Sequence, residues 1–131
     1  MALVRAIFLD DDSELRAVVV ELLALIGVAC DAIASVPEMT ERLVQADRPY
    51  DVAILDINLG PRVPSGLDAY RCLRAMGFAG RIAFLTGHAR SHPLVEEANR
   101  LGDALVYAKP ITLASLRRIL FHDSPAATPH P

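Results

Sequence analysis

The sequence predicts an α/β fold: a doubly wound, five-stranded parallel sheet with helices on both faces. Short runs that are almost wholly apolar, typical of strands covered on both faces, recur five times in the 131 residues. Each run is followed by apolar residues at steps of three and four positions, the spacing of a helix with one buried face. Strands that alternate with helices in this way form a parallel sheet.

The first half of the chain supplies two strand–helix pairs. Leu3–Leu9 is the expected first strand, and helical spacing then runs from Ser13 to Gly27, which is placed to end the helix. Val28–Ala34 is the expected second strand. A capping box formed by Ser35 and Glu38 opens the second helix. The residues expected to be buried on that helix are Met39, Leu43 and Val44.

The second half continues the alternation three times. The expected strands are Val52–Leu55, Arg81–Thr86 and Ala104–Ala108. The expected helices run from Leu67 to about Met76, from His92-Pro93 onward, and from Thr112, which caps the last one. Right-handed crossovers leave few topologies, so we expect the flavodoxin-like strand order 2-1-3-4-5.

Length and composition indicate one cytoplasmic domain, residues 1–121, followed by a flexible proline-rich tail, 122–131. The chain is 53% apolar, so it can form a core, and its net charge of −3 without a Lys/Arg cluster argues against nucleic-acid binding. The longest apolar stretch, Val18–Cys30, is too short to span a membrane, and no cleavable signal pattern follows the N-terminal apolar run.

Polar residues suited to metal and phosphate chemistry follow four of the predicted strands. Asp10 and Asp11 follow the first strand, Asp56 and Lys109 follow the third and fifth, and Thr86 ends the fourth. The carboxyl ends of parallel strands meet at one edge of a sheet, where ligands bind in this architecture. Clustered carboxylates repel one another unless a cation offsets them. The pattern therefore predicts a divalent-cation site beside an aspartate that accepts a phosphoryl group.

Each of these residues also has a simpler explanation when taken alone. An aspartate before a helix often serves as its N-cap, and Asp12 or Ser13 is expected to do so here. Asp56 and Lys109 would then be ordinary solvated strand ends, and Thr86 an ordinary β-branched strand residue. Capping requires only one carboxylate, however, and the recurrence at four strand ends favours the functional interpretation.

The chain resembles the bacterial response-regulator receiver domains over residues 3 to about 121. The segments that carry the resemblance are Leu9–Asp12, Ile54–Asn58, Phe84–Gly87 and Ala108–Pro110. The resemblance implies a protein that is not an enzyme beyond labelling itself and losing the label. A histidine kinase or a histidine phosphotransfer protein would supply the phosphoryl group. An output partner would dock on the face formed by the fourth helix, fifth strand and fifth helix.

The resemblance also assigns roles to individual residues. Asp56 would be the phosphoacceptor, with Thr86 and Lys109 contacting phosphoryl oxygens. The implied cofactor is Mg²⁺. Its ligands would come from four residues: Asp11 and Asp56 directly, Asp10 through a bound water, and Asn58 through its backbone carbonyl. Mg²⁺ keeps several waters, so few protein ligands suffice. The family further has a cis peptide before the proline that matches Pro110.

Several features depart from, or refine, this pattern. The loop that follows Asp56 is about two residues longer than in most receivers and carries Arg62, which is either a solvated surface residue or an arginine that stabilises the aspartyl phosphate. His88 lies where the family tunes the lifetime of the phosphoryl group. Gly87 follows Thr86 at a position where a larger side chain is expected to crowd the site.

The fifth strand lacks the aromatic residue that many receivers place three positions before the lysine. That position is Val106, and strand alternation directs its neighbour Tyr107 to the opposite face, where it is expected to pack. Two alternatives to a phosphorylated receiver therefore stay open. One is a receiver fold that only binds proteins. The other is a phosphatase of the haloacid-dehalogenase type, although Glu14 stands where its first-strand motif needs threonine.

Overall fold

The structure is a computed structural model that describes residues 4–89 and 91–124. Its strands are β1 (Val4–Leu9), β2 (Val28–Ile33), β3 (Val52–Asp56), β4 (Arg81–Thr86) and β5 (Leu105–Ala108). Its helices are α1 (Ser13–Leu25), α2 (Val36–Gln45), α3 (Gly66–Ala75), α4 (Pro93–Arg100) and α5 (Leu113–Arg117), and α5 continues into a π-helical turn, Arg118–His122. Every predicted strand and helix is present.

All strand pairs are parallel, and the sheet order is β2-β1-β3-β4-β5, so the predicted topology is confirmed. The central strands β1, β3 and β4 are buried over most of their length. The edge strand β5 is only partly buried. Within the described part of the chain, no helix is both long and apolar enough to cross a membrane.

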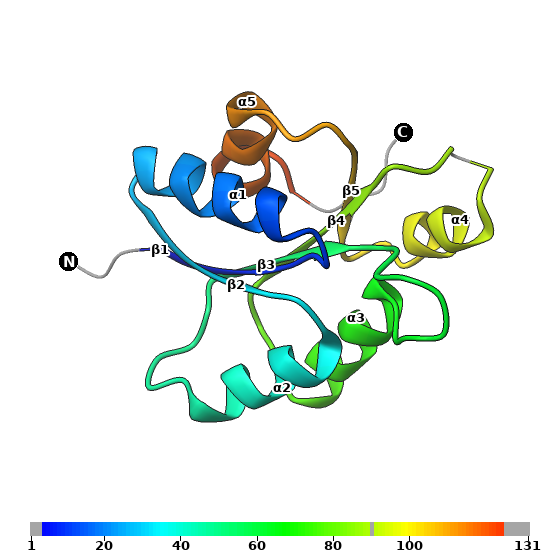
Figure 1. Ribbon diagram of the computed structural model, residues 1–131, viewed down its shortest axis with the longest axis horizontal. Coiled ribbons are helices and arrows are strands. Elements are labelled where there is room, and N and C mark those ends of the chain that lie inside the picture. Colours follow the sequence, from blue (N-terminus) through cyan, green and yellow to red (C-terminus); the bar gives the residue numbers. More distant parts are fainter. Residues whose placement is uncertain (1–3, 90, 125–131) are drawn as a thin grey trace.

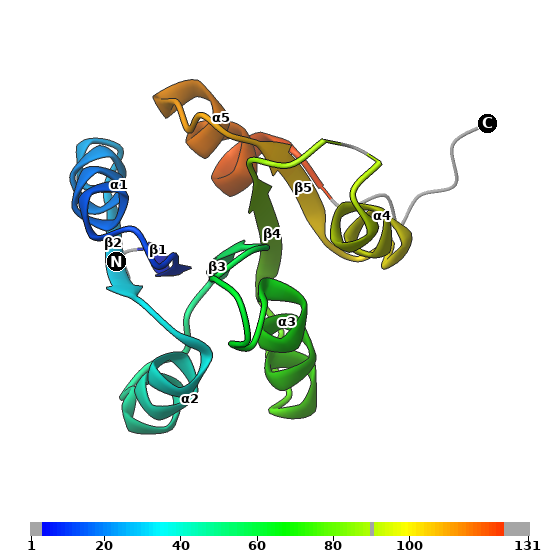
Figure 2. The ribbon, with the colours of Figure 1, turned by 45° about the vertical axis from the view of Figure 1, so that its right-hand side comes forward.

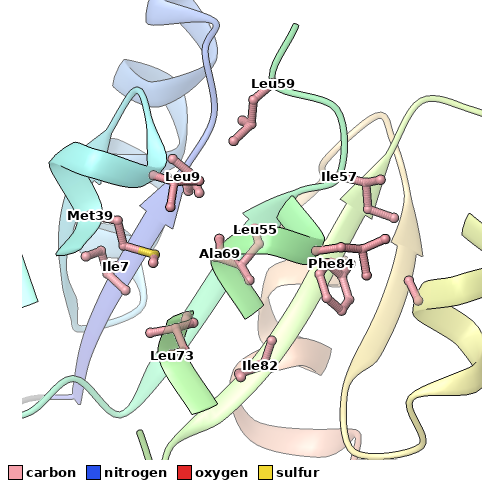
Figure 3. Packing of buried hydrophobic residues seen from close by; sticks show 14 of the residues in the cluster. Ile7, Leu9, Met39, Leu55, Ile57, Leu59, Ala69, Leu73, Ile82 and Phe84 are labelled. Atoms are coloured by element: carbon pink, nitrogen blue, oxygen red, sulfur yellow. The ribbon is translucent and has the colours of Figure 1, made fainter. Parts of the chain in front are cut away.

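Alternate residues of the central strands build two hydrophobic cores, one on each face of the sheet. Ile7, Leu55 and Phe84 pack against α2, α3 and α4 on one face (Figure 3). Phe8 and Ile54 pack against α1 and α5 on the other face. Figures 1 and 2 show the same division, with α1 and α5 above the sheet and α2 and α3 below it. Both faces are covered, which explains why the strand sequences are continuously apolar.

Helix caps begin the helices just beyond the strand ends. The Asp12 carboxylate caps α1 by accepting hydrogen bonds from two backbone N–H groups. Of the two predicted caps, Asp12 and Ser13, the first is therefore the one used. At α2, Ser35 accepts the Glu38 N–H, but the Glu38 carboxylate accepts from the N–H of Ala34 instead of closing the predicted box on Ser35. Gly27 follows α1 with φ 81, the left-handed conformation expected of a glycine that ends a helix.

Packing corrects one of the predicted core residues. Met39 is fully buried and Leu43 packs against the core, but Val44 is 75% exposed because it lies off the buried face of α2. Val106 and Tyr107 pack into opposite cores, as strand alternation predicts. The Tyr107 hydroxyl also donates to the Asp123 carboxylate.

The segment assigned to the tail begins with residues that contact the domain. His122 closes the π-helical turn, and the side chains of Arg118 and Arg81 bond to Asp123 and Ser124, respectively. The rest of the predicted tail, 125–131, lies outside the described residues.

Candidate functional site

The predicted site residues come together at the carboxyl edge of the sheet. Asp10 and Lys109 directly follow β1 and β5, while Asp56 and Thr86 are the last residues of β3 and β4. The neighbouring pairs of strands are in parallel register up to these positions, so that Asp56 lies opposite Leu85 and Thr86 opposite the last residue of β5. The topology therefore places residues that are 99 positions apart in the sequence in direct contact.

Lys109 neutralises part of the negative charge at this edge. Its Nζ atom donates to Asp10 Oδ2 at 3.0 Å and lies 3.4 Å from Asp56 Oδ2. Asp10 is fully buried, and its other carboxylate oxygen accepts the backbone N–H of Asp12 at 2.9 Å. A buried carboxylate is tolerated only when it is paired in this way. The peptide between Lys109 and Pro110 is cis, as the resemblance implied.

Three carboxylates form a group that suits a metal ion. One oxygen from each of Asp10, Asp11 and Asp56 lies within 4.8 Å of the others, and Asp11 is exposed to solvent. Hard oxygen donors of this kind favour Mg²⁺, and an exposed ligand leaves room for the waters that Mg²⁺ retains. One ammonium, which contacts two of the three carboxylates, leaves net negative charge at the edge. The residues present therefore fit a divalent cation.

The electrostatics of Asp56 depend on its burial. Removal from water, followed by the repulsion of Asp10, raises the pKa of Asp56 from 3.8 to about 7, against the opposing attraction of Lys109. Burial alone would lower the pKa of Lys109, but its hydrogen bond to Asp10 and the negative charge of Asp56 outweigh burial and raise it. The lysine therefore stays charged at neutral pH, while the phosphoacceptor candidate is poised between its two protonation states.

A hydrogen-bonded bridge joins the loops that follow β3 and β4. The Asn58 side chain faces His88, with Nδ2 3.0 Å from His88 Nε2. The orientation of the amide follows from its other contact, since Asn58 Oδ1 accepts the N–H of Gly60 at 3.0 Å. Asn58 therefore donates, and His88 accepts through Nε2. The His88 backbone N–H in turn donates to the Thr86 hydroxyl at 2.9 Å, which connects this bridge to the predicted phosphate-contacting residue.

Gly66 allows α3 to begin directly against the end of β3. A Cβ atom at Gly66 would lie 2.2 Å from the backbone oxygen of Asp56, which is closer than any real contact. The Gly66 N–H also donates to the Ile57 carbonyl at 2.9 Å, closing the intervening loop at its base. By contrast, a Cβ at Gly87 would meet nothing within 4 Å. The expectation that a larger side chain there would crowd the site stays a prediction.

Arg62 is the predicted modulator that the structure does not bring to the site. Its side chain is exposed and makes no hydrogen bond or ion pair with the residues that the structure describes. Its φ of 61 places a non-glycine residue in the left-handed region, at the tip of the long loop. Arg62 could act directly on the site only if the loop folded over the carboxylates.

Sequence reasoning missed Arg16, whose guanidinium donates to the backbone carbonyl of Asp10 at 2.8 Å. Its position was a usable signal that it has a specific partner, because the positive end of the helix dipole disfavours a cation in the first turn of α1. Arg16 thereby fixes the backbone carbonyl of Asp10, whose carboxylate pairs with Lys109.

A hollow lies between α4 and the β4–β5 edge, beside Thr86. Its volume is about 360 Å³. The residues that line it are Thr86, His88, Val95, Asn99, Val106 and Ala108.

Comparison with known proteins identifies the family. The sequence model described as the response regulator receiver domain matches residues 6–121. The chain therefore belongs to the response-regulator receiver domains of two-component systems. Among curated protein sequences, no relative matches.

Solved structures agree with this assignment. The CheY-like response regulator receiver domain from Methylobacillus flagellatus is 26% identical, with a TM-score of 0.72 over 91% of this chain and 97% of that one. Chemotaxis protein CheY4 from Vibrio cholerae is 21% identical, with a TM-score of 0.74 over 91% and 100%. A response regulator from Burkholderia pseudomallei, solved with a phosphorylated aspartic acid, calcium ion and citrate, is 23% identical, with a TM-score of 0.75 over 89% and 66%. The last two show the fold alone.

Substitution of Gly66 and of Gly87 distinguishes a glycine that is required by close backbone packing from one that only lies near the site. Gly66→Ala should cost more than about 2 kcal/mol of unfolding free energy, because α3 must move away from the Asp56 backbone. Gly87→Ala is the matched control and should change stability by less than about 0.5 kcal/mol. Urea unfolding of both variants measures the difference. Equal costs would contradict the close approach at Gly66.

The raised pKa of Asp56 predicts a pH-dependent gain in stability for Asp56→Asn without metal. Between about pH 4 and pH 7 the folded parent retains a proton that the unfolded chain releases, so the parent loses stability as pH rises. The variant lacks this titrating group. Its stability relative to the parent should therefore increase by about 2–4 kcal/mol from pH 4 to pH 8. Urea unfolding in chelator measures it, and a difference independent of pH would contradict the assignment.

Proposed function

We propose that this chain is a phosphoacceptor response regulator that receives a phosphoryl group on Asp56 in the presence of Mg²⁺. The observation that carries the proposal is the grouping of three carboxylates at one sheet edge, two of which contact a charged lysine. Phosphoryl transfer depends mainly on positioning and on stabilising charge, and these residues supply both. The Burkholderia pseudomallei response regulator, which has the same fold, was solved with a phosphorylated aspartic acid.

In the proposed reaction, a carboxylate oxygen of Asp56 attacks the phosphorus atom of the donor. A P–O bond forms while the bond from phosphorus to the donor's imidazole nitrogen breaks, and that nitrogen keeps the electron pair. The Lys109 ammonium and the Thr86 hydroxyl would contact the phosphoryl oxygens as charge accumulates on them. Asp10, Asp11, Asp56 and the Asn58 carbonyl would hold Mg²⁺, which offsets the negative charge shared by the phosphoryl group and the carboxylates.

The donor would be a cytoplasmic histidine kinase or histidine phosphotransfer protein. Labelling of Asp56 would bias a conformational equilibrium of the surface formed by α4, β5 and α5, where an output partner would dock. The hollow beside Thr86 supports this choice of surface, because incomplete packing under α4 lets that helix shift at small cost. The chain itself would act as a switch that is labelled once and not as an enzyme with turnover.

The phosphatase alternative fits the geometry less well. Its nucleophile would be Asp10, which is fully buried and has both carboxylate oxygens hydrogen-bonded. The second aspartate of its motif would be Asp12, which instead caps α1. A receiver fold that only binds proteins would leave the carboxylate group without a use.

Intact-mass measurement tests the proposed function directly. The parent chain incubated with Mg²⁺ and a small-molecule phosphodonor should gain one phosphoryl group, and chelator should abolish the gain. Asp56→Asn should gain none, because it lacks the nucleophile. No gain in the parent would favour the unphosphorylated binding module, and a gain that persists in Asp56→Asn would mean that another residue is the acceptor. Turnover of a chromogenic phosphoester would indicate the phosphatase.

The two proposed modulators should affect the lifetime of the label differently. His88→Ala removes the bridge to Asn58 and should change the rate of phosphoryl loss several-fold. Arg62→Ala should shorten the lifetime only if the loop folds over the labelled aspartate, where arginine would pair with the phosphoryl group. Decay of the labelled mass with time measures both. Unchanged decay in either variant would remove that residue from the proposal.

A further inference from the structure

His92, at the start of α4, is connected to the site through His88. The two imidazole rings stack, with their centroids 4.2 Å apart and their planes 19° from parallel. His92 is also the N-cap of α4, where its Nδ1 atom accepts the Leu94 N–H at 3.2 Å. Both rings are half-buried, so the stack is partly shielded from water.

The stacking partner is held on three sides. His88 accepts from Asn58 at its ring edge, donates its backbone N–H to Thr86, and lies against His92 with its ring face. The first two contacts bind it to the loops that follow β3 and β4, the strands that end in Asp56 and Thr86. Only the third contact comes from α4. The ring of His92 is thus the contact that fixes the plane of the bridging imidazole.

We propose that His92 is a positioning residue that holds His88 across the approach to Asp56, and thereby limits how fast the phosphoryl group is gained and lost. This inference rests on the proposed function. A bridge between the two loops beyond Asp56 narrows the path for water and for a small donor. When the stack is absent, His88 can rotate about its side-chain bonds, and the bridge to Asn58 is made for a smaller fraction of the time.

Two substitutions separate the ring of His92 from its capping function. His92→Asn keeps an N-cap acceptor but removes the ring, since asparagine is among the best N-cap residues. His92→Phe keeps a stacking ring but removes the acceptor. A structural role at the helix end predicts that the phenylalanine variant is the damaged one. A positioning role through the stack predicts the opposite order.

The readouts are the rate of phosphoryl gain from a small-molecule phosphodonor with Mg²⁺ and the rate of loss after the donor is removed, both by intact mass. His92→Asn should accelerate both by about two- to tenfold, the range that corresponds to the strength of an aromatic pair. His92→Phe should remain close to the parent. General damage to the site would slow phosphoryl gain. Faster gain together with faster loss therefore distinguishes positioning from misfolding.

A double-mutant cycle completes the test. In a His88→Ala background, His92→Asn should have no further effect on either rate, because the group through which it acts is gone. An additive effect in that background, unchanged rates in His92→Asn, or equal changes in the two His92 variants would each overturn the positioning role. A parent chain that gains no phosphoryl group overturns the proposed function and this inference with it. A labelled parent with unaffected variants overturns this inference alone.

Discussion

The structure depends on one constraint: several carboxylates are concentrated at an edge of the sheet where water is largely excluded. Asp10 and Asp56 are buried at one edge of the sheet with Asp11 beside them, and Lys109 supplies the cation that contacts both buried carboxylates. Separated from its partners, each group would cost several kcal/mol to bury. The carboxylates are stable only as a set, and the set forms only when β1, β3 and β5 end at the same edge.

This constraint links the fold to the chemistry. A parallel sheet is the simplest arrangement that brings all the strand ends together, and two covered faces keep the surroundings of those ends apolar. The same apolar surroundings, together with the repulsion of Asp10, raise the pKa of Asp56, because Lys109 offsets only part of the negative charge. A cation that binds the three carboxylates, or a phosphoryl group that contacts Lys109, would thus change the energy of the whole edge.

The sequence was most informative where one residue type satisfies a simple physical need. Strand order, the Asp12 cap and the meeting of Asp10, Asp56 and Lys109 follow from periodicity and from strand ends. It was least informative where the outcome depends on distances between loops. The close approach of Gly66 to the Asp56 backbone was not predicted, because the path of the 57–65 loop decides which glycine approaches another backbone. The contact of Arg16 with a backbone carbonyl and the stacking of His88 on His92 leave no periodic pattern.

The backbone closure at Gly66 bears on how such a domain can diverge. The Gly66 N–H and the Ile57 carbonyl join the two ends of the loop, so its intervening residues form a side excursion from a fixed base. Residues can then be added or removed at the tip, where Arg62 lies, without moving the acid at the end of β3 or the helix that follows. The cost of lengthening such a loop grows only slowly with its length. The closure thereby separates a region free to acquire new recognition features from a chemical centre that must stay in place.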